Sequence, residues 1–256
     1  MNYIDKIVNE KKGTAIINNL LNETWNDQEE RYIDANYDTL CKPEYRQPLI
    51  EALLHEQNAY CCYCMQNLEE SNKISLEHFI PKNCNQDTFA RYNHPIFTKN
   101  VIHTNSFDKG NKIIPPEKYP HDIAYHNLLV SCKNPVHCNL GRGNKFIRPL
   151  VYDDQIMKKV EYDRNGRIFS AEYFKEINQL NLSVEELRQF RQIWNIISKK
   201  YPDLDLKTIT CQDLDIIVKG LSLLKNPKLL ENLFNSPKNI EKLLDYKWFY
   251  EYYKSK

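Results

Sequence analysis

Four of the eight cysteines stand in two close pairs. Cys61 and Cys64 form a C-x2-C motif, and Cys132 and Cys138 form a wider C-x5-C motif. Each short loop can turn two thiolates toward one tetrahedral zinc ion, at Zn–S distances of about 2.3 Å. Because the second spacing exceeds the usual two to four residues, His137 beside Cys138 competes as a ligand. We predict a structural zinc held by the four cysteines; the alternative is a group of free thiols in the core.

Three further cysteines, Cys41, Cys84 and Cys211, stand alone in the sequence. The first residues lack the apolar segment of a secretory signal, so we expect the thiols to stay reduced in a cytoplasmic protein. Isolated cysteines often behave as small buried hydrophobic residues. We expect the same of these three.

A zinc ion enclosed by four thiolates has no open position for catalysis, so chemistry requires other residues. The run KISLEHFIPKN, residues 73–83, carries Glu77 and His78 in a strand-like pattern. Alternation places Ile74 and His78 on one face, and Pro81 is expected to end the strand. A neutral histidine with an ordinary pKa near 6.5 can take a proton from water at neutral pH. His78 is therefore a candidate general base; the alternative is a histidine satisfied inside the core.

Two asparagines flank the second cysteine pair. In HNLLVSC, residues 126–132, Asn127 stands at the start of a second predicted strand. After Cys138 the run NLGRGNKF predicts a helix with Asn139 in its first turn and Arg142 one turn later. A zinc ion that joins the two cysteine loops brings these residues toward His78. Two strands and a helix that converge on a histidine and two asparagines are typical of a nuclease.

The order of these motifs, CxxC, EHFIPK, HNLLVSC and CNLGRGNK, resembles the ββα-metal (HNH) endonucleases in which zinc-knuckle cysteines bracket the active site. The longer run from ALLHEQNAYCCYC through EHFIPK, VEYDRNGRIF and LNLSVEELRQFRQIW is similar to the PtuB-type HNH effectors of Septu antiphage systems, which also occur beside some retrons. The resemblance covers residues 49–194. It implies an α+β fold with a ββα-metal core.

The resemblance also implies roles for individual residues. His78 matches the general base, Asn127 the asparagine that braces the loop, and Asn139 the last ligand of a catalytic ion. Glu77 matches the acidic residue that holds the same ion. Two oxygen ligands with open positions suit Mg²⁺ or Mn²⁺. Strict alternation puts Glu77 and His78 on opposite faces, so these roles require the strand to end or bulge here.

The activity implied by the resemblance is metal-dependent hydrolysis of phosphodiester bonds, with DNA expected ahead of RNA. The implied partner is a PtuA-like ATPase, joined in retron systems by a reverse transcriptase and its RNA–DNA product. Two alternatives stay open: an endoribonuclease acting on structured RNA such as tRNA, and a non-catalytic zinc module that binds nucleic acid. Glu77, His78 and Asn139 together favour an enzyme, because binding alone needs none of them.

The formal net charge of +1 gives no overall attraction to nucleic acid, so phosphate contacts require a local patch or a partner. Lys82, Arg142 and Lys145 are the candidate phosphate contacts. For the two lysines, ordinary solvated surface charge is an equal interpretation.

The interval between His78 and Asn127 contains 48 residues, many more than a minimal turn needs. Over residues 83–122 we predict a long polar loop. Its Asn, Lys, His and aromatic residues suit the stacking of single-stranded or looped nucleic acid, and a mobile lid or a partner-binding arm is equally compatible. No role is assigned to its three histidines, His94, His103 and His121.

The whole chain of 256 residues, with only 6 glycines, favours a helix-rich protein. We predict helices in residues 1–57, the nuclease core in residues 58–170, and helices again in residues 171–256. No apolar run reaches membrane-spanning length, so no membrane contact is expected. Residues 180–256 end in an aromatic cluster, Trp248–Tyr253, and are predicted to dock a partner; the alternative is that the aromatic rings pack inward.

Overall fold

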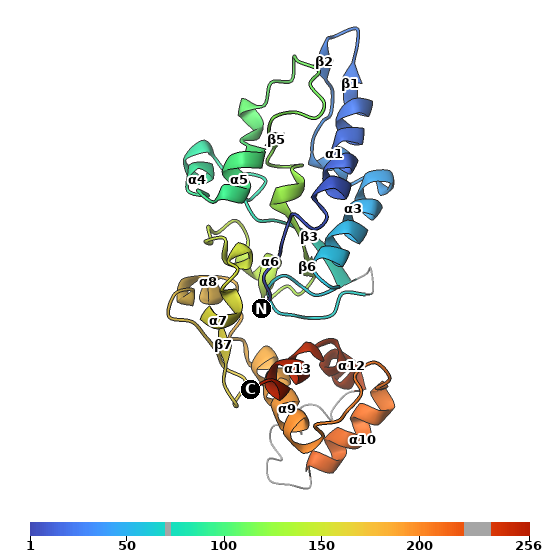
Figure 1. Cartoon of the computed structure of the whole chain (residues 1–256), viewed down its shortest axis with the longest axis vertical. Helices are drawn as coiled ribbons and strands as arrows, with labels where there is room; N and C mark the ends of the chain where they lie inside the picture. Colours follow the sequence, from blue (N-terminus) through green and yellow to red (C-terminus); the bar gives the residue numbers. More distant parts are fainter. Residues whose placement is uncertain (70–72, 223–236) are drawn as a thin grey trace.

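The computed structural model of the chain describes residues 1–69, 73–222 and 237–256. Figure 1 shows helices distributed along the whole molecule, with only short strands among them. The strands described there pair into sheets of two: β1 with β2, β3 with β6, β4 with β5, and β7 with β8. The predicted mixture of many helices and a few strands is confirmed.

The pair β3 (Ile74–His78) and β6 (Leu128–Cys132) is the longest of these sheets. The strands run antiparallel, with Glu77 opposite Leu129 and His78 opposite Leu128. Every residue of β6 is buried, which fits its nearly continuous apolar sequence LLVSC. Strand β3 ends at His78, earlier than Pro81, because the next residues turn away from β6. Helix α6 (Cys138–Arg142) follows β6 in the chain.

The N-terminal segment packs against this strand pair. Helix α1 (Glu10–Thr24) buries Ile17, Leu20 and Leu21, whose spacing places them on one face. The LIEALL run lies in helix α3 (Pro43–Glu56), as predicted, and its buried residues include Leu49 and Leu53. Before α3 stand elements that the helical prediction for residues 1–57 did not contain: strands β1 (Trp25–Asn26) and β2 (Arg31–Tyr32), and the short helix α2 (Tyr37–Leu40).

A buried ion pair fixes the N-terminal tail beneath β6. Lys6 Nζ lies 2.7 Å from a carboxylate oxygen of Glu56, and both side chains are almost fully buried. The same ammonium group donates a hydrogen bond of 2.6 Å to the carbonyl oxygen of Leu128, opposite His78 in the sheet. Removing one partner of such a pair leaves a buried charge uncompensated.

Residues between β3 and β6 fold into ordered elements, so the prediction of a long polar loop over residues 83–122 is wrong. Aromatic residues of this segment pack into the main core: the ring centroids of Phe79 and Phe97 lie 5.7 Å apart, and those of Phe79 and Tyr152, which follows α6 in the chain, lie 5.3 Å apart. We call residues 79–127 the insertion. Its elements are α4 (Gln86–Ala90), α5 (Pro95–Asn100), β4 (Val101–Ile102), the 3₁₀ helix η2 (Thr104–Ser106), β5 (Tyr119–Pro120) and the 3₁₀ helix η3 (Tyr125–Asn127).

After α6 the chain forms a connecting region. The connecting elements are the 3₁₀ helix η4 (Leu150–Tyr152), α7 (Ile156–Lys159), β7 (Glu161–Tyr162), β8 (Ile168–Phe169) and α8 (Phe174–Gln179). Gly166 lies in the turn between β7 and β8 with φ +75°, and a Cβ atom there would lie 2.0 Å from the carbonyl oxygen of Arg188. Only glycine permits this close approach of the hairpin to the next helix.

Helices α9 (Glu185–Lys200), α10 (Cys211–Ser222), α12 (Pro237–Asp245) and α13 (Trp248–Lys254) group at one end of the molecule (Figure 1). Trp194 of α9 is fully buried and donates a hydrogen bond of 2.9 Å to the carbonyl oxygen of Leu243 in α12. Pro237 begins α12, as its place in the sequence predicts. The run NPKLLENLF, residues 226–234, also predicts a helix with proline near its first position, and it lies outside the described residues.

The C-terminal aromatic residues face inward, in agreement with the interpretation that these rings pack into the core. Phe249, Tyr250, Tyr252 and Tyr253 are buried. The rings of Tyr162 and Phe249 lie 5.0 Å apart, so the cluster packs against the connecting region. These rings therefore stabilise the fold. None of the helices in the described ranges combines the length and apolar character needed to cross a bilayer.

Candidate functional site

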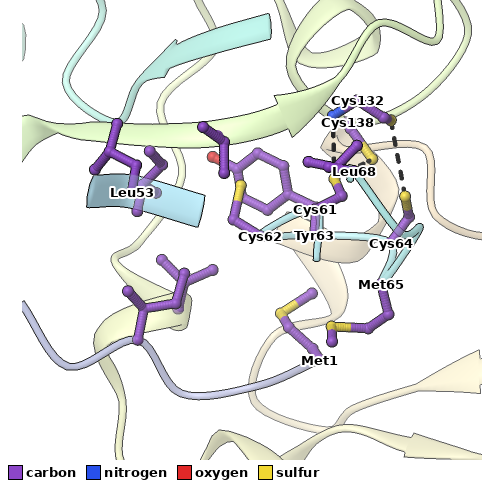
Figure 2. Packing of buried hydrophobic residues seen from close by; sticks show 14 of the residues in the cluster. Met1, Leu53, Cys61, Cys62, Tyr63, Cys64, Met65, Leu68, Cys132 and Cys138 are labelled. Atoms are coloured by element: carbon purple, nitrogen blue, oxygen red, sulfur yellow. Dashed lines mark hydrogen bonds between the residues drawn. The ribbon is translucent and has the colours of Figure 1, made fainter. Parts of the chain in front are cut away.

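The four paired cysteines converge on one buried point, as predicted. Figure 2 shows Cys61 and Cys64 on one loop facing Cys132 and Cys138 from the other side. The sulfur atoms of Cys61 and Cys138 lie 3.8 Å apart, as do those of Cys64 and Cys132. Two thiolates bound at about 2.3 Å to one tetrahedral zinc ion are about 3.8 Å apart. The residues present therefore fit a structural zinc ion.

His137 lies beside this group and contacts its ligands. Its Nδ1 atom is 3.0 Å from the sulfur of Cys138 and 3.9 Å from that of Cys132. An Nδ1–H group here donates to a thiolate and supports the metal site from outside. The main-chain N–H of Cys132 likewise points at the sulfur of Cys61, at 3.4 Å. The geometry thus favours the four cysteines as ligands and His137 as their hydrogen-bond partner.

His78 is held in a defined orientation at the end of β3. Its Nε2 atom lies 2.8 Å from the carbonyl oxygen of Asp122. Since a carbonyl oxygen only accepts, Nε2 carries the proton and Nδ1 keeps its lone pair. The ring of Tyr37 meets the imidazole edge to face, with centroids 4.6 Å apart. Burial lowers the pKa of His78 to about 4, so the ring is neutral at neutral pH.

Asn127 braces the two segments that flank His78. Its amide nitrogen donates to the carbonyl oxygens of Ile80, at 2.9 Å, and His121, at 2.6 Å. Its amide oxygen accepts a hydrogen bond of 2.6 Å from the main-chain N–H of Ile80. The side chain is fully buried. It ties the chain just after His78 to the chain just before Asp122, whose carbonyl orients His78.

Glu77 points to the other face of β3, where it forms an internal ion pair. Its carboxylate oxygen accepts from Arg142 at 2.6 Å and from Tyr63 at 2.7 Å. Both charged side chains are about 98–99% buried. Burial raises the pKa of Glu77 above its ordinary value, and the guanidinium of Arg142 opposes this shift. Neither the end of β3 nor a bulge turns Glu77 toward His78.

This pairing corrects the phosphate-binding role predicted for Arg142. Its guanidinium also donates to the carbonyl oxygen of Phe79 at 2.6 Å, the hydroxyl of Tyr92 at 3.2 Å and the carbonyl oxygen of Lys145 at 2.8 Å. The side chain is 1% exposed. Arg142 is therefore a structural cross-link and cannot reach a nucleic acid phosphate.

Asn139 lies beside the early part of β3. Its amide nitrogen donates to the hydroxyl of Ser75 at 3.3 Å and to the carbonyl oxygen of Leu76 at 3.5 Å. Ser75 stands three residues before His78, about 10 Å along a strand. Because Glu77 is engaged by Arg142 and Asn139 is engaged near Ser75, the two residues do not fit a shared Mg²⁺ or Mn²⁺ site in this arrangement.

The predicted lysines lie in different places. Lys82 is half-exposed, with its ammonium group 3.6 Å from Asp38 and 4.9 Å from the centre of the Tyr37 ring. It lines a cavity of about 370 Å³ to which Tyr37 and Asp122, both contacts of His78, also contribute. Lys145 is exposed just after the end of α6, and its carbonyl oxygen accepts from Arg142. Only Lys82 adjoins the surroundings of His78.

Several residues at this site had no sequence signal. Tyr37 and Asp122 contact His78 from segments 41 residues before and 44 residues after it. Cys84 is half-buried and lies 3.7 Å from His121, which corrects its interpretation as a small buried hydrophobic residue. Cys41 and Cys211 are also only partly buried. A cysteine can bind a metal, so residue type alone allows this role for Cys84. Its neighbours in the fold, His103 and His121, do not follow it at the short spacing of a metal-binding motif.

Comparison with protein-family models, with curated proteins and with solved structures finds no match for this chain.

Proposed function

We propose that this protein is a nuclease of the HNH type that hydrolyses phosphodiester bonds in DNA, with His78 as its general base. The observation that carries the proposal is the fixed imidazole at the end of β3. Its Nε2–H group donates to Asp122, its Nδ1 atom keeps a lone pair, and burial lowers its pKa so that the neutral form prevails. Asp122 and Tyr37, which contact the imidazole, also line the polar cavity of about 370 Å³.

The order of elements supports the same proposal. Strands β3 and β6 are antiparallel and α6 follows at once, which is the ββα order of the HNH fold. The four-cysteine group joins the loop before β3 to the end of β6 and the start of α6. A zinc ion there holds these three elements together without taking part in catalysis.

In the proposed reaction, Nδ1 of His78 takes a proton from the attacking water, whose oxygen bonds to phosphorus. The bond from phosphorus to the leaving oxygen of the DNA backbone breaks, and this oxygen takes a proton from solvent. Asp122 orients the ring, and Asn127 holds the Asp122 segment against the segment that follows His78. Such a positioned base contributes about 10²- to 10⁴-fold to the rate. Lys82, at the rim of the cavity, is placed to contact a backbone phosphate. No step is assigned to Mg²⁺ or Mn²⁺, because Glu77 and Asn139 do not form a shared site.

The proposed partner is a PtuA-like ATPase, which in retron systems acts with a reverse transcriptase and its RNA–DNA product. A net charge of +1 supports a need for a partner, since the chain alone has little attraction for nucleic acid. A binding module without catalysis is the second candidate, favoured by the engagement of Glu77 in an ion pair.

The test is to incubate the purified chain, alone and with a candidate ATPase, with plasmid DNA and with total RNA. Each reaction contains Mg²⁺, Mn²⁺ or a chelator. We expect cleavage of plasmid. Loss of cleavage in the chelator would require a catalytic ion held by residues other than the Glu77 and Asn139 pair. Cleavage of RNA alone would replace DNA by RNA in the proposal, and retention of nucleic acid on the protein without any cleavage would favour the binding module.

A further inference from the structure

A second group of metal-binding side chains lies in the insertion. Cys84, His103 and His121 each offer one ligand atom, and these atoms lie within 4.8 Å of one another. The sulfur of Cys84 is 3.7 Å from Nε2 of His121. The rings of His103 and His121 stack with centroids 5.0 Å apart and planes inclined by 25°. In the described ranges, this group and the four-cysteine group are the only such clusters found.

These three residues come together only through the fold of the insertion. Cys84 precedes α4, His103 precedes η2, and His121 follows β5. Phe89 of α4 packs edge to face against both imidazole rings, with centroids 5.5 Å from each. His103 and His121 are 6% and 1% exposed, whereas Cys84 is half-buried. The site is therefore built on one side from buried, packed rings and opens on the other.

The open side faces the cavity of about 370 Å³, which Cys84, His103 and His121 all line. Its other walls are polar and include Asn83, Asn105 and Asp122. Three protein ligands next to solvent-filled polar space are the pattern of a zinc site with one open coordination position, in contrast to the closed four-cysteine site.

Supporting hydrogen bonds are present around His121. Its Nδ1 atom lies 3.0 Å from both the hydroxyl oxygen and the main-chain nitrogen of Thr104, and the hydroxyl donates a hydrogen bond of 2.6 Å to Asp122. In the tautomer in which Nδ1 carries the proton and donates to the Thr104 hydroxyl, Nε2 is free to bind a metal beside Cys84. A carboxylate linked to a ligating histidine in this way raises the basicity of the ligand.

From this geometry we propose that Cys84, His103 and His121 bind one Zn²⁺ ion, whose fourth position holds a water molecule that faces the cavity. A site of one thiolate and two imidazoles binds Zn²⁺ in preference to Mg²⁺ or Ca²⁺. The ion cross-links three separate segments of the insertion. It also lies next to Asp122, which orients His78, but the binding of zinc does not depend on the proposed nuclease activity.

A competing arrangement uses the same rings without a metal. Nε2 of His121 lies 3.1 Å from the carbonyl oxygen of Lys82, and Nε2 of His103 lies 3.1 Å from that of Cys84. The main-chain N–H groups of Thr104 and Asn105 point at the Nδ1 atoms of the two rings. If both rings serve only as hydrogen-bonded core residues, the chain binds a single zinc ion.

The decisive measurement is the zinc content per chain of the full-length protein, purified without added metal and again after zinc loading and dialysis. We expect two zinc ions per chain. Cys84→Ser and His121→Asn should each reduce this to one, with the far-ultraviolet circular dichroism spectrum unchanged. The matched controls are Cys211→Ser and His94→Gln, a partly buried cysteine and a histidine of the same insertion that lie outside both groups. Both controls should keep two ions.

Replacement of zinc by Co²⁺ gives a second readout on the wild-type chain, which needs no substitution. A four-thiolate site and a site with one thiolate differ in the strength of their sulfur-to-cobalt absorption, so two successive equivalents should add bands of unequal intensity. A single equivalent in wild type, or two equivalents that persist in Cys84→Ser, would overturn the proposal.

Discussion

At the residue scale, two residues that are adjacent in sequence, Glu77 and His78, have different surroundings. Glu77 forms a buried ion pair with Arg142, whereas His78 contacts Asp122 and Tyr37, two residues that line a polar cavity. The sequence pattern correctly predicts that strand alternation separates them. It cannot show that Arg142 is the partner of Glu77, because the pairing depends on how α6 packs against β3. A basic residue one turn into a helix looks the same from sequence whether it binds phosphate or closes a buried ion pair.

The pKa of His78 leads to a first prediction. Since burial lowers it to about 4, the folded protein binds the proton only below that pH. The ring should therefore stay neutral from pH 8 down to about pH 5, where a histidine with the ordinary pKa near 6.5 is mostly protonated. Nuclear magnetic resonance titration of ¹⁵N-histidine-labelled protein, with the His78 signals identified by their loss in His78→Gln, measures this. A midpoint near 6.5 would show that the ring is not buried as described.

The ion pair of Glu77 and Arg142 leads to a second prediction, which concerns the stability of the fold. Glu77→Gln leaves the guanidinium buried without its counter-charge, so the free energy of unfolding should fall by about 3–5 kcal/mol. Lys145→Gln, at an exposed position three residues after Arg142, should change it by less than about 0.5 kcal/mol. Urea denaturation measures both. Should Glu77→Gln retain full stability and lose only metal-dependent cleavage, the predicted role of Glu77 as a ligand would be restored.

At the element scale, the four-cysteine group joins two segments that are far apart in sequence. The C-x2-C and C-x5-C spacings predicted it correctly, because short loops constrain where thiolates can point. The β3 and β6 strands and the start of α6 also follow from local patterns. The fold of the insertion does not follow from local patterns. Its helices are short, and its buried aromatic residues are spread among polar ones, a composition that also fits a loop. The cluster of Cys84, His103 and His121 was not predicted for the same reason.

Removal of the four-cysteine zinc site should therefore unfold the region around β3 and β6. Structural zinc contributes about 10–16 kcal/mol in small zinc domains, comparable to a whole domain's stability of about 5–15 kcal/mol. Cys61→Ser should lose the zinc ion of this site and its near-ultraviolet circular dichroism signal, whereas Cys211→Ser should keep both. A Cys61→Ser protein that has lost this ion and retains the wild-type spectrum would show that the four thiols need no metal.

At the scale of the whole molecule, the C-terminal helices cover the first cysteine loop. The main-chain N–H of Asn67 donates to the carbonyl oxygen of Asp245 at 2.7 Å, and Lys73 pairs with the Asp245 carboxylate at 3.0 Å. The hydroxyl of Tyr246 approaches the sulfur of Cys64 at 3.9 Å. Amphipathic spacing predicted these helices, but it cannot show which surface an apolar face will cover.

A chain that ends at Ser170 should therefore aggregate or lose zinc, because it exposes the cysteine loop and the ring of Tyr162. Removal of only Ser255 and Lys256, which are exposed, is the matched control and should leave solubility and zinc content unchanged. Size-exclusion chromatography with metal analysis compares the two. A soluble, monomeric, zinc-containing chain of residues 1–170 would show instead that the C-terminal helices are dispensable for folding and free to serve a partner.

The most direct test of the central claim is the single-turnover rate of plasmid cleavage by His78→Ala, measured under the conditions in which the wild-type chain is most active. The proposed general base predicts a rate lower by about 10²- to 10⁴-fold, with zinc content and plasmid binding unchanged. The control is His94→Ala, which changes a half-buried histidine of the insertion and should cleave at the wild-type rate. Cleavage by His78→Ala within a few-fold of wild type would contradict the assignment.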